Sequence, residues 1–297
     1  MDPLLLFDLN FWDKIWNAVD WEVGESEETE KKLAAWSRRA QEYFDNVASP
    51  SGQRRIQDTL DFLDVYNVLQ PNLRILDLGC GPGNFTLAFA ERGHEVVALD
   101  PVPKMIGILE EKLNERPNLK PLVTTVIADW VTVSLEDYGW QNHFDLVFVS
   151  MTPGVRNPAT LTKAMAASRQ NLFLSLFAGP RHLEATDTIY KKVHGAPYNN
   201  PSRDALLPLN WLYTHGYRPV VHYTHWDREH QQTIEQAVSD IKKHLAVRMQ
   251  LTTQVEQLIE NHVRVNASPD GIFTDRKGST AAMLLWDIDK KCLALKK

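Results

Sequence analysis

The sequence predicts a doubly wound α/β domain built on a mostly parallel sheet, and three observations lead to that class. Short apolar segments alternate with helical segments between residues 73 and 178, which is the pattern of strands joined by helical crossovers. Three glycines stand within five residues directly after the first apolar segment, as at a strand-to-helix turn that binds a ligand. Hydrophobic residues make up 43% of the chain and charged residues 24%, which is ordinary for a folded protein.

Residues 1–52 are predicted to form an N-terminal helical cap. Apolar side chains recur there at helical spacing, namely Phe11, Trp12, Ile15, Trp16 and Val19. Two uses of the tryptophans remain open. Trp12, Trp16 and Trp36 either bury the cap against the sheet domain or form an apolar lid that holds a cationic substrate on the ring faces. The segment Pro50-Ser51-Gly52 marks the boundary of the cap.

Residues 53–178 are predicted to form the α/β core. Buried apolar runs predict five strands, at 73–78, 95–100, 122–127, 144–149 and 172–177. Helical segments at 85–92 and 104–113 connect them, and Gly93 follows the first of these as a C-terminal cap. The alternation of the two element types indicates that helices cover both faces of the sheet.

Residues 179–297 are predicted to complete the sheet and to carry helical insertions. The segments 218–226 and 280–288 are predicted to be strands, and 232–247 and 251–264 to be helices. No internal repeat and no low-complexity tract interrupts this part of the sequence.

Charge and cysteine content narrow the classes of partner. A net charge of −6 and a pI near 5.9 give no overall attraction to a phosphate backbone, so no nucleic-acid partner is expected. Cys80 and Cys292 are too few for a disulfide framework, which fits a reducing compartment. The start lacks a basic leader and no apolar stretch is long enough to cross a bilayer, so a cytoplasmic protein without membrane contact is expected. The oligomeric state stays open, and a homodimer is compatible with the sequence.

The glycine-rich segment after the first predicted strand carries the strongest chemical signal. It reads Leu76-Asp77-Leu78-Gly79-Cys80-Gly81-Pro82-Gly83-Asn84. Glycines let the backbone turn sharply and approach a ligand at the carboxyl edge of the sheet. A dinucleotide fingerprint would need its third glycine at position 84. Because Asn84 occupies that position, a nicotinamide-dependent oxidoreductase is the weaker alternative.

This segment resembles the first motif of class I S-adenosylmethionine (SAM)-dependent methyltransferases, of the small-molecule type. The resemblance implies SAM as cofactor, residues 53–178 as the SAM-binding core, and a seven-stranded sheet whose last strand runs antiparallel. It places Asp77 near the amino group of the cofactor, where a carboxylate complements an ammonium. It also implies that residues 1–52 form a lid and that residues 179–297 form the acceptor side.

Further positions fall in register with the same family. Asp100 ends the second predicted strand and would accept hydrogen bonds from both ribose hydroxyls. Asp129 would accept from the adenine amine, and Trp130 would cover the ring. Met105 would pack on adenine or belong to the helix core. The full set of cofactor residues that the resemblance implies is Tyr43, Asp77, Gly79, Cys80, Gly81, Asn84, Asp100, Pro101, Met105, Asp129, Trp130 and Ser150.

The segment after the fourth predicted strand bears on the substrate. Ser150-Met151-Thr152-Pro153 stands where methylases of planar amides and base nitrogens often carry an Asn/Asp-Pro-Pro-aromatic run. We therefore expect methyl transfer to a small-molecule acceptor, at oxygen or nitrogen more than at carbon or sulfur. The alternatives are a SAM-binding sensor or assembly protein without methyl transfer and, further off, an RNA or protein methyltransferase.

Histidines supply the candidates for acid–base and metal chemistry. His182 follows the fifth predicted strand beside Arg181 and is the candidate general base, which is needed only when the acceptor enters protonated. His222, His225, Asp227 and His230 cluster near a predicted strand. Alternation along a strand places His222 and His225 on opposite faces, so no metal site is expected.

Overall fold

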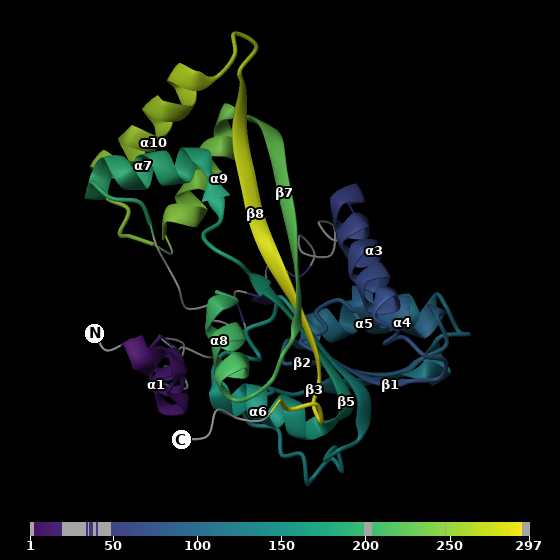
Figure 1. Cartoon of the computed structure of the whole chain (residues 1–297). Helices are drawn as coiled ribbons and strands as arrows, with labels where there is room; N and C mark the ends of the chain where they lie inside the picture. Colours follow the sequence, from purple (N-terminus) through teal and green to yellow (C-terminus); the bar gives the residue numbers. More distant parts are fainter. Residues whose placement is uncertain are drawn as a thin grey trace. The chain divides into compact units, whose positions relative to one another are not determined.

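The structure is a computed structural model that describes residues 3–19, 34, 36, 37, 40, 49–198, 204–246 and 248–292. The chain divides into two compact units (Figure 1). Unit 1 comprises Met1–Leu176, Ala205–His222 and Met283–Lys297, and unit 2 comprises Phe177–Asp204 and Tyr223–Ala282. The units do not follow the chain in order, because two segments of its C-terminal third belong to unit 1.

Unit 1 is built on a parallel sheet. Its strands are β1 (Arg74–Leu78), β2 (Glu95–Asp100), β3 (Val123–Ile127), β4 (Phe144–Ser150) and β5 (Ser168–Phe177), in the order β3-β2-β1-β4-β5. Each neighbouring pair in this order runs parallel. β4 is buried at nearly every position, as expected of a strand covered on both faces. The predicted doubly wound α/β fold is therefore confirmed.

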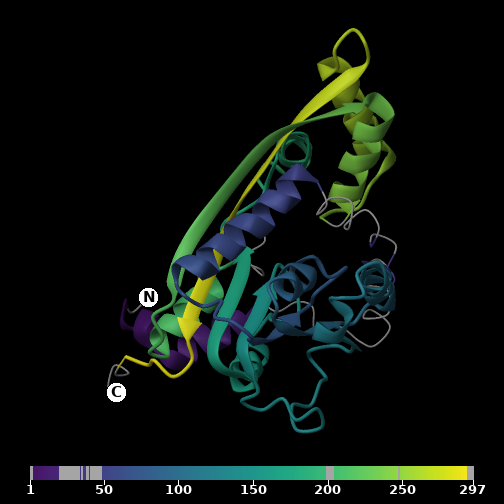
Figure 2. The same cartoon turned by 90° about the vertical axis from the view of Figure 1, so that its right-hand side faces the viewer.

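Two apolar clusters show how helices cover the strands of unit 1. Helix α3 (Pro50–Val65) and helix α4 (Asn84–Glu91) share one cluster with β1, β4 and β5. In it the rings of Phe148 and Phe173 stack with centroids 4.7 Å apart. α3 also reaches β8 (Ile272–Asp287), where the Thr59 hydroxyl lies 3.7 Å from the Met283 sulfur. Figure 2 shows α3 crossing in front of the strands. Helix α5 (Pro103–Asn114) packs on α4 and β2 in the other cluster.

Two further helices of unit 1 have well-defined ends. Helix α6 (Pro158–Ala167) begins at an Asn157–Thr160 capping box, in which each side chain accepts the backbone amide of the other residue. Helix α8 (Leu206–Thr214) is largely buried. Among the described residues, no helix is both long enough and apolar enough to cross a membrane.

The N-terminal segment of unit 1 packs on α8. It consists of a 3-10 helix, η1 (Pro3–Phe7), and helix α1 (Leu9–Ala18), which begins at an Asp8 cap. Trp16 is buried, with its ring 6.4 Å from that of Trp211. The Trp211 indole N–H donates to the Asp13 carboxylate at 2.6 Å. Of the two uses considered for the tryptophans, Trp16 therefore serves as a packing residue within unit 1.

The described residues of unit 2 form three helices and a β-ribbon. The helices are α7 (Glu184–His194), α9 (Ile234–Ala246) and α10 (Thr253–Asn266), and they share one apolar cluster with Phe273. The strands are β6 (His182–Leu183), most of β7 (Val220–Thr233) and the first part of β8 (Ile272–Asp287). β7 pairs with β8, and β6 pairs with β8 antiparallel.

In the described part of the chain the sheet has eight strands, so the expected number of seven was wrong by one. β6 has only two residues, which is too short to give a periodic signal. β8 follows β5 in the strand order and runs antiparallel to it, as the family resemblance implied. The direction follows from the backbone, since Ile288 N–H donates to Gln170 C=O whereas Ala178 N–H donates to Thr280 C=O.

Candidate functional site

The glycine-rich segment forms a tight turn between β1 and α4. Gly79, Gly81 and Gly83 all have positive φ angles, of 71°, 55° and 81°, which side chains with a Cβ rarely adopt. The amides of Gly79 and Cys80 both donate to the carbonyl of Leu99, at 2.7 and 3.0 Å. These bonds fix the turn to the carboxyl end of β2. Glycine therefore stands at the positions where the backbone of the turn needs a positive φ.

Close packing adds a second reason for glycine at the two ends of this turn. A Cβ at Gly79 would lie 2.1 Å from the Thr152 hydroxyl oxygen, and one at Gly83 would lie 2.3 Å from a Leu109 methyl. The segment after β4, which contains Thr152, therefore rests directly on the turn. The backbone cradle exists only because these positions lack side chains.

Two buried carboxylates flank the turn. Asp77, near the end of β1, is 3% exposed and accepts a hydrogen bond from the Thr86 hydroxyl at 2.6 Å. Burial raises the pKa of Asp77 to about 7; the nearby charge of Asp100 adds to this effect and the bond from Thr86 opposes it. A bound ammonium close to Asp77 would lower this pKa again and stabilise the charged carboxylate, so the position suits a cationic partner.

Asp100 ties the turn to the start of α5. Its two carboxylate oxygens accept the amides of Gly81 and Val102, each at 2.9 Å. Burial raises the pKa of Asp100, and these two backbone bonds oppose the rise. A carboxylate has about four acceptor positions. Two of them remain for a ligand that offers a pair of hydroxyl groups.

Three other predicted cofactor residues lie on or beside the turn. Cys80 is half-buried and packs against the cluster of α4 and α5; burial, together with the charges of Asp77 and Asp100, raises the pKa of its thiol. Asn84 is the half-buried first residue of α4, and Pro101 is half-buried beyond Asp100. All three therefore lie close in sequence to the residues that shape the turn.

Asp129 and Trp130 follow β3, the neighbour of β2. Asp129 is half-buried, and one oxygen of its carboxylate accepts the amide of Val131 at 2.9 Å. Trp130 is 1% exposed, and its indole N–H donates to the Thr160 carbonyl of α6 at 3.2 Å. The Trp130 side chain thus packs under α6 and offers almost no surface to a ligand, whereas the Asp129 carboxylate is accessible.

Met105 and Ser150 are placed differently from each other. Met105 lies in the first turn of α5 and is buried in a cluster with Ala40, Val102 and Ile108, against which Trp36 packs. Ser150 is the half-buried last residue of β4. Tyr43 lies outside the described residues.

Beyond β4 the backbone is strained, which often marks a functional segment. Met151 has a positive φ of 54° without being glycine. Its amide donates to the Ser175 carbonyl at 2.9 Å, while the Thr152 hydroxyl accepts the Gly154 amide at 3.2 Å. This geometry sets Thr152 against Gly79 and so brings the end of β4 to the glycine turn.

The structure therefore gathers most of the predicted cofactor residues at the carboxyl edge of four adjacent strands of unit 1. Asp77, the glycine turn and Asp100 are linked by the bonds described above. The neighbouring strand ends carry Asp129 and Ser150. This arrangement provides a glycine cradle, one carboxyl group suited to an ammonium and one suited to paired hydroxyls, which fits the polar groups of SAM.

His182 lies in unit 2, whereas the cofactor residues described above belong to unit 1. Its side chain is 61% exposed, and its Nδ1 lies 3.7 Å from an oxygen of Asp187. It lines a cavity of about 260 Å³ in unit 2, together with Pro180, His225, Asp227, Gly278, Ser279 and Thr280.

The other histidines of the predicted cluster are divided between the two units. The His222 ring lies 5.8 Å from that of Phe62 in unit 1, whereas His225 Nδ1 lies 3.1 Å from the Thr280 hydroxyl in unit 2. Within the described part of the chain, no three His, Cys, Asp or Glu side chains are grouped as metal ligands.

Sequence reasoning missed three residues at this edge of the sheet. Thr86 could have been noticed as a polar residue among the apolar positions of α4. Thr152 and Lys163 gave no comparable signal, because their partners are far away in sequence: Thr152 packs on Gly79, and the Lys163 ammonium donates to three carbonyls of residues 130–133.

Comparisons with known proteins point to a methyltransferase domain in this part of the chain. A family model described as a methyltransferase domain matches residues 75–172. A 23S rRNA (uracil(1939)-C(5))-methyltransferase of Shewanella denitrificans is 28% identical over 171 residues, which cover 48% of this chain and 36% of that protein. An uncharacterized methyltransferase of Mycobacterium bovis is 50% identical over 77 residues, covering 26% of this chain and 27% of that protein.

A solved structure agrees in fold. The crystal structure of a Bacillus halodurans protein assigned as a methyltransferase matches with a TM-score of 0.51 at 15% identity, covering 78% of this chain and 99% of that one. The match of residues 75–172 to a methyltransferase domain supports the class I, SAM-dependent family, with SAM as its cofactor. The resemblance seen in the sequence is thus confirmed. The match spans 36% of the length of the rRNA methyltransferase.

Proposed function

We propose that the protein transfers the methyl group of SAM to a small-molecule acceptor, at oxygen or nitrogen. One observation carries this proposal: three positive-φ glycines, at 71°, 55° and 81°, lie between two buried carboxylates at the carboxyl ends of β1 and β2. In this proposal residues 53–178 bind the cofactor and residues 179–297 form the acceptor side.

Each carboxylate has a separate task in the proposed complex. Asp100 accepts from the ribose hydroxyls while it keeps its bonds to the amides of Gly81 and Val102. Asp77 holds the amino group of the methionine part. Asp129 accepts from the exocyclic amine of adenine, and the backbone of Trp130 borders the purine.

SAM supplies an electrophilic methyl group on a positively charged sulfur. The protein's contribution is to hold the acceptor in line with that group and to exclude water. His182 is the proposed base for an acceptor that enters protonated. Because its Nδ1 faces Asp187 at 3.7 Å, Nε2 is the atom that takes the proton.

Two observations favour a small acceptor over RNA. The net charge of −6 provides no general attraction for a polyanion. The segment Ser150-Met151-Thr152-Pro153 also lacks the Asn/Asp-Pro-Pro-aromatic pattern associated with methylation of planar amino groups. The rRNA methyltransferase relative gives the RNA alternative its support, so the test must separate the two.

The test is methyl transfer from tritium-labelled SAM to a cell extract that is divided by size after the reaction. We expect the label in the small-molecule fraction and none that is released by ribonuclease or protease digestion. Label confined to RNA or protein would overturn the small-acceptor proposal. SAM binding without any labelled product in extracts from several growth conditions would instead favour the sensor or assembly function.

A further inference from the structure

In the turn after β3, residues 129–133, three backbone amides are satisfied from within the turn. The Asp129 carboxylate accepts the amide of Val131 at 2.9 Å. The Asp129 carbonyl accepts the amides of Thr132 and Val133, each at 3.0 Å. These bonds do not involve the carbonyls of Trp130, Val131 and Val133, which need partners outside the turn.

One side chain from α6 satisfies three of those carbonyls. The Lys163 ammonium donates to the carbonyl oxygen of Trp130 and to those of Val131 and Val133, the latter two at 3.1 and 2.9 Å. An ammonium has three N–H donors, and all three are used. Lys163 therefore has no free donor for a substrate, and its role must be exerted through the turn.

Lys163 also fixes the aromatic residue of the turn. Its ammonium lies 4.8 Å from the centroid of the Trp130 ring, within the range of a cation–π contact. The indole N–H of Trp130 bonds to the carbonyl of Thr160, one helical turn before Lys163. The side chain and the backbone of Trp130 are thus both held by the same helix.

The helix that carries Lys163 is itself well anchored. Thr160 is buried, and its amide donates to the Asn157 side chain at 2.9 Å within the capping box. Burial lowers the pKa of Lys163, and the carboxylate of Asp129 opposes that shift. The charges of Lys163 and Asp129 are therefore coupled across the turn.

We propose that Lys163 is a positioning residue for the adenine-binding part of the cofactor site. By holding three carbonyls of residues 129–133, it sets the position of the Asp129 carboxylate and of the Trp130 backbone. The inference rests on the proposed function, in which Asp129 accepts from the adenine amine. Without the ammonium, the turn would have to reorient its carbonyls towards water, and the Asp129 carboxylate would no longer be held in the orientation that binds the adenine amine.

The test compares two nucleosides that differ at C6 of the purine, which carries the group read by Asp129, and in the proton on the adjacent N1. S-adenosylhomocysteine carries the exocyclic amine, whereas S-inosylhomocysteine carries a carbonyl that repels a carboxylate. Calorimetry on the full chain should give a wild-type preference for the adenosyl compound of more than about tenfold. For Lys163→Met we expect adenosyl affinity to fall roughly tenfold and inosyl affinity to change less than about twofold, so the preference is lost. Lys163→Arg should restore part of it.

The matched control is Lys290→Met, which removes the same charge from a side chain that is 84% exposed. It should leave both affinities unchanged. A Lys163→Met protein that melts earlier but keeps the wild-type preference would show a merely structural role and overturn the inference. Should that variant not fold, Lys163→Gln gives the same comparison, because it keeps a donor but not the charge.

Asp129→Ala separates failure of this inference from failure of the proposed function. If Asp129→Ala abolishes the preference and Lys163→Met preserves it, the assignment of Lys163 is wrong while the cofactor site stands. If the wild type binds neither nucleoside, or if Asp129→Ala keeps the full preference, the proposed adenine site itself is wrong and the inference falls with it.

Discussion

Asp77 shows how one residue links stability to the cofactor site. Burial raises its pKa from 3.8 to about 7 in the folded chain, so the folded state holds this proton more tightly than the unfolded state does. The contribution of the protonated Asp77 to the free energy of unfolding is therefore complete below about pH 4 and is lost as the pH rises towards 7. A shift of this size corresponds to a loss on the order of 4 kcal/mol.

Asp77→Asn should remove this pH dependence. The amide is neutral at every pH, and its carbonyl can still accept the Thr86 hydroxyl. We expect the variant to be more stable than the wild type at pH 8, with a difference that shrinks towards pH 4, as measured by urea unfolding across that range. Asp58→Asn, at a surface position whose side chain is 46% exposed, is the control. A difference between Asp77→Asn and wild type that stays constant with pH would show that Asp77 is not buried as described.

Gly79 offers a second test at the scale of one residue. Gly79→Ala combines an unfavourable φ of 71° with a contact of 2.1 Å between the new Cβ and the Thr152 hydroxyl. Gly93→Ala is a matched control, because Gly93 has a φ of 83° but nothing within 4 Å of the Cβ position. We expect a loss of about 1–2 kcal/mol for Gly93→Ala and a further 1–3 kcal/mol or so for Gly79→Ala.

The free energy of unfolding in urea measures both glycine variants. Equal losses would mean that Thr152 can move aside, in which case the segment after β4 does not rest on the turn. A larger loss at Gly79 supports the cradle, because only that position carries the close contact.

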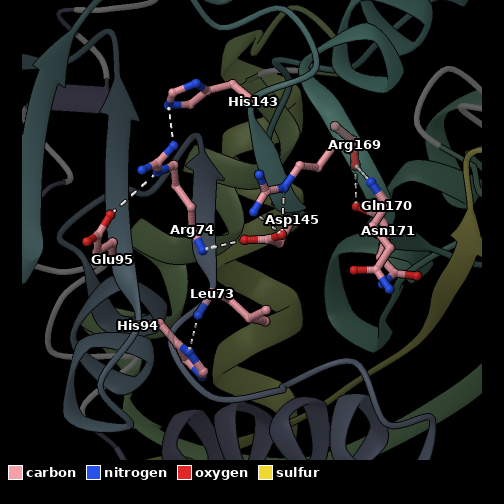
Figure 3. A network of polar contacts seen from close by, with 10 residues as sticks. Leu73, Arg74, His94, Glu95, His143, Asp145, Arg169, Gln170 and Asn171 are labelled. Carbon is pink, nitrogen blue, oxygen red and sulfur yellow. Dashed lines mark hydrogen bonds and ion pairs between the residues drawn. The ribbon is translucent and has the colours of Figure 1, made fainter.

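At the scale of elements, the amino ends of the unit 1 strands hold the sheet together, whereas their carboxyl ends carry the proposed cofactor site. The amino ends of the strands are joined by an ionic network (Figure 3). Asp145 of β4 accepts the Arg74 amide of β1 at 2.8 Å and the Arg169 guanidinium of β5 at 2.7 and 2.6 Å. Arg74 also lies 3.4 Å from Glu95 of β2 and from His143. The glycine turn lies at the opposite, carboxyl edge.

Asp145→Ala should therefore reduce stability without reducing SAM affinity. The Asp145 side chain is 13% exposed, and its loss leaves the Arg74 amide and the Arg169 guanidinium without their acceptor, at a cost of about 2–3 kcal/mol. Glu95→Ala is the control. The Glu95 side chain is 64% exposed, so its ion pair with Arg74 contributes less than about 1 kcal/mol. Chemical unfolding and calorimetry would measure the two effects. A fall in SAM affinity at Asp145 would contradict this separation of tasks.

The elements that the sequence predicts best are those with a continuous apolar signal. The predicted strand 95–100 coincides with β2, and 144–149 differs from β4 by one residue. In contrast, β7 continues to Thr233 through Asp227-Arg228-Glu229-His230-Gln231-Gln232, although the predicted strand ended at 226. These polar residues lie in a two-stranded ribbon whose backbone pairing, not side-chain burial, keeps the strand extended.

The candidate site shows the same division. The order of Asp77, Asp100 and Asp129 along the chain could be predicted, because each ends a strand or follows one, and parallel strands bring such positions to one edge. The contacts of Lys163 and Thr152 could not, because they depend on how α6 and the segment after β4 pack against loops distant in sequence. Trp130 follows β3 as expected, but its ring is buried under α6 and therefore does not cover the adenine ring, which was the role considered for it.

At the scale of the whole molecule, the proposed tasks fall in different units. The predicted cofactor residues within the described part of the chain belong to unit 1, and His182 belongs to unit 2. His182→Ala should therefore leave SAM affinity unchanged in calorimetry. With an acceptor that enters protonated, it should lower turnover by about 10²-fold or more. His225→Ala, which alters the same unit 2 cavity, is the control, and equal losses in the two variants would remove His182 as the base.

The most direct test of the central claim is a calorimetric titration of the full chain with SAM and, separately, with NAD. If the glycine turn and its aspartates bind SAM, the wild type will show one saturable SAM site and no heat with NAD. Asp100→Ala will then weaken SAM binding by about 1–3 kcal/mol, through the loss of charge-assisted hydrogen bonds to the ribose. Tighter binding of NAD than of SAM, or an Asp100→Ala protein that is folded and binds SAM as the wild type does, would contradict the account.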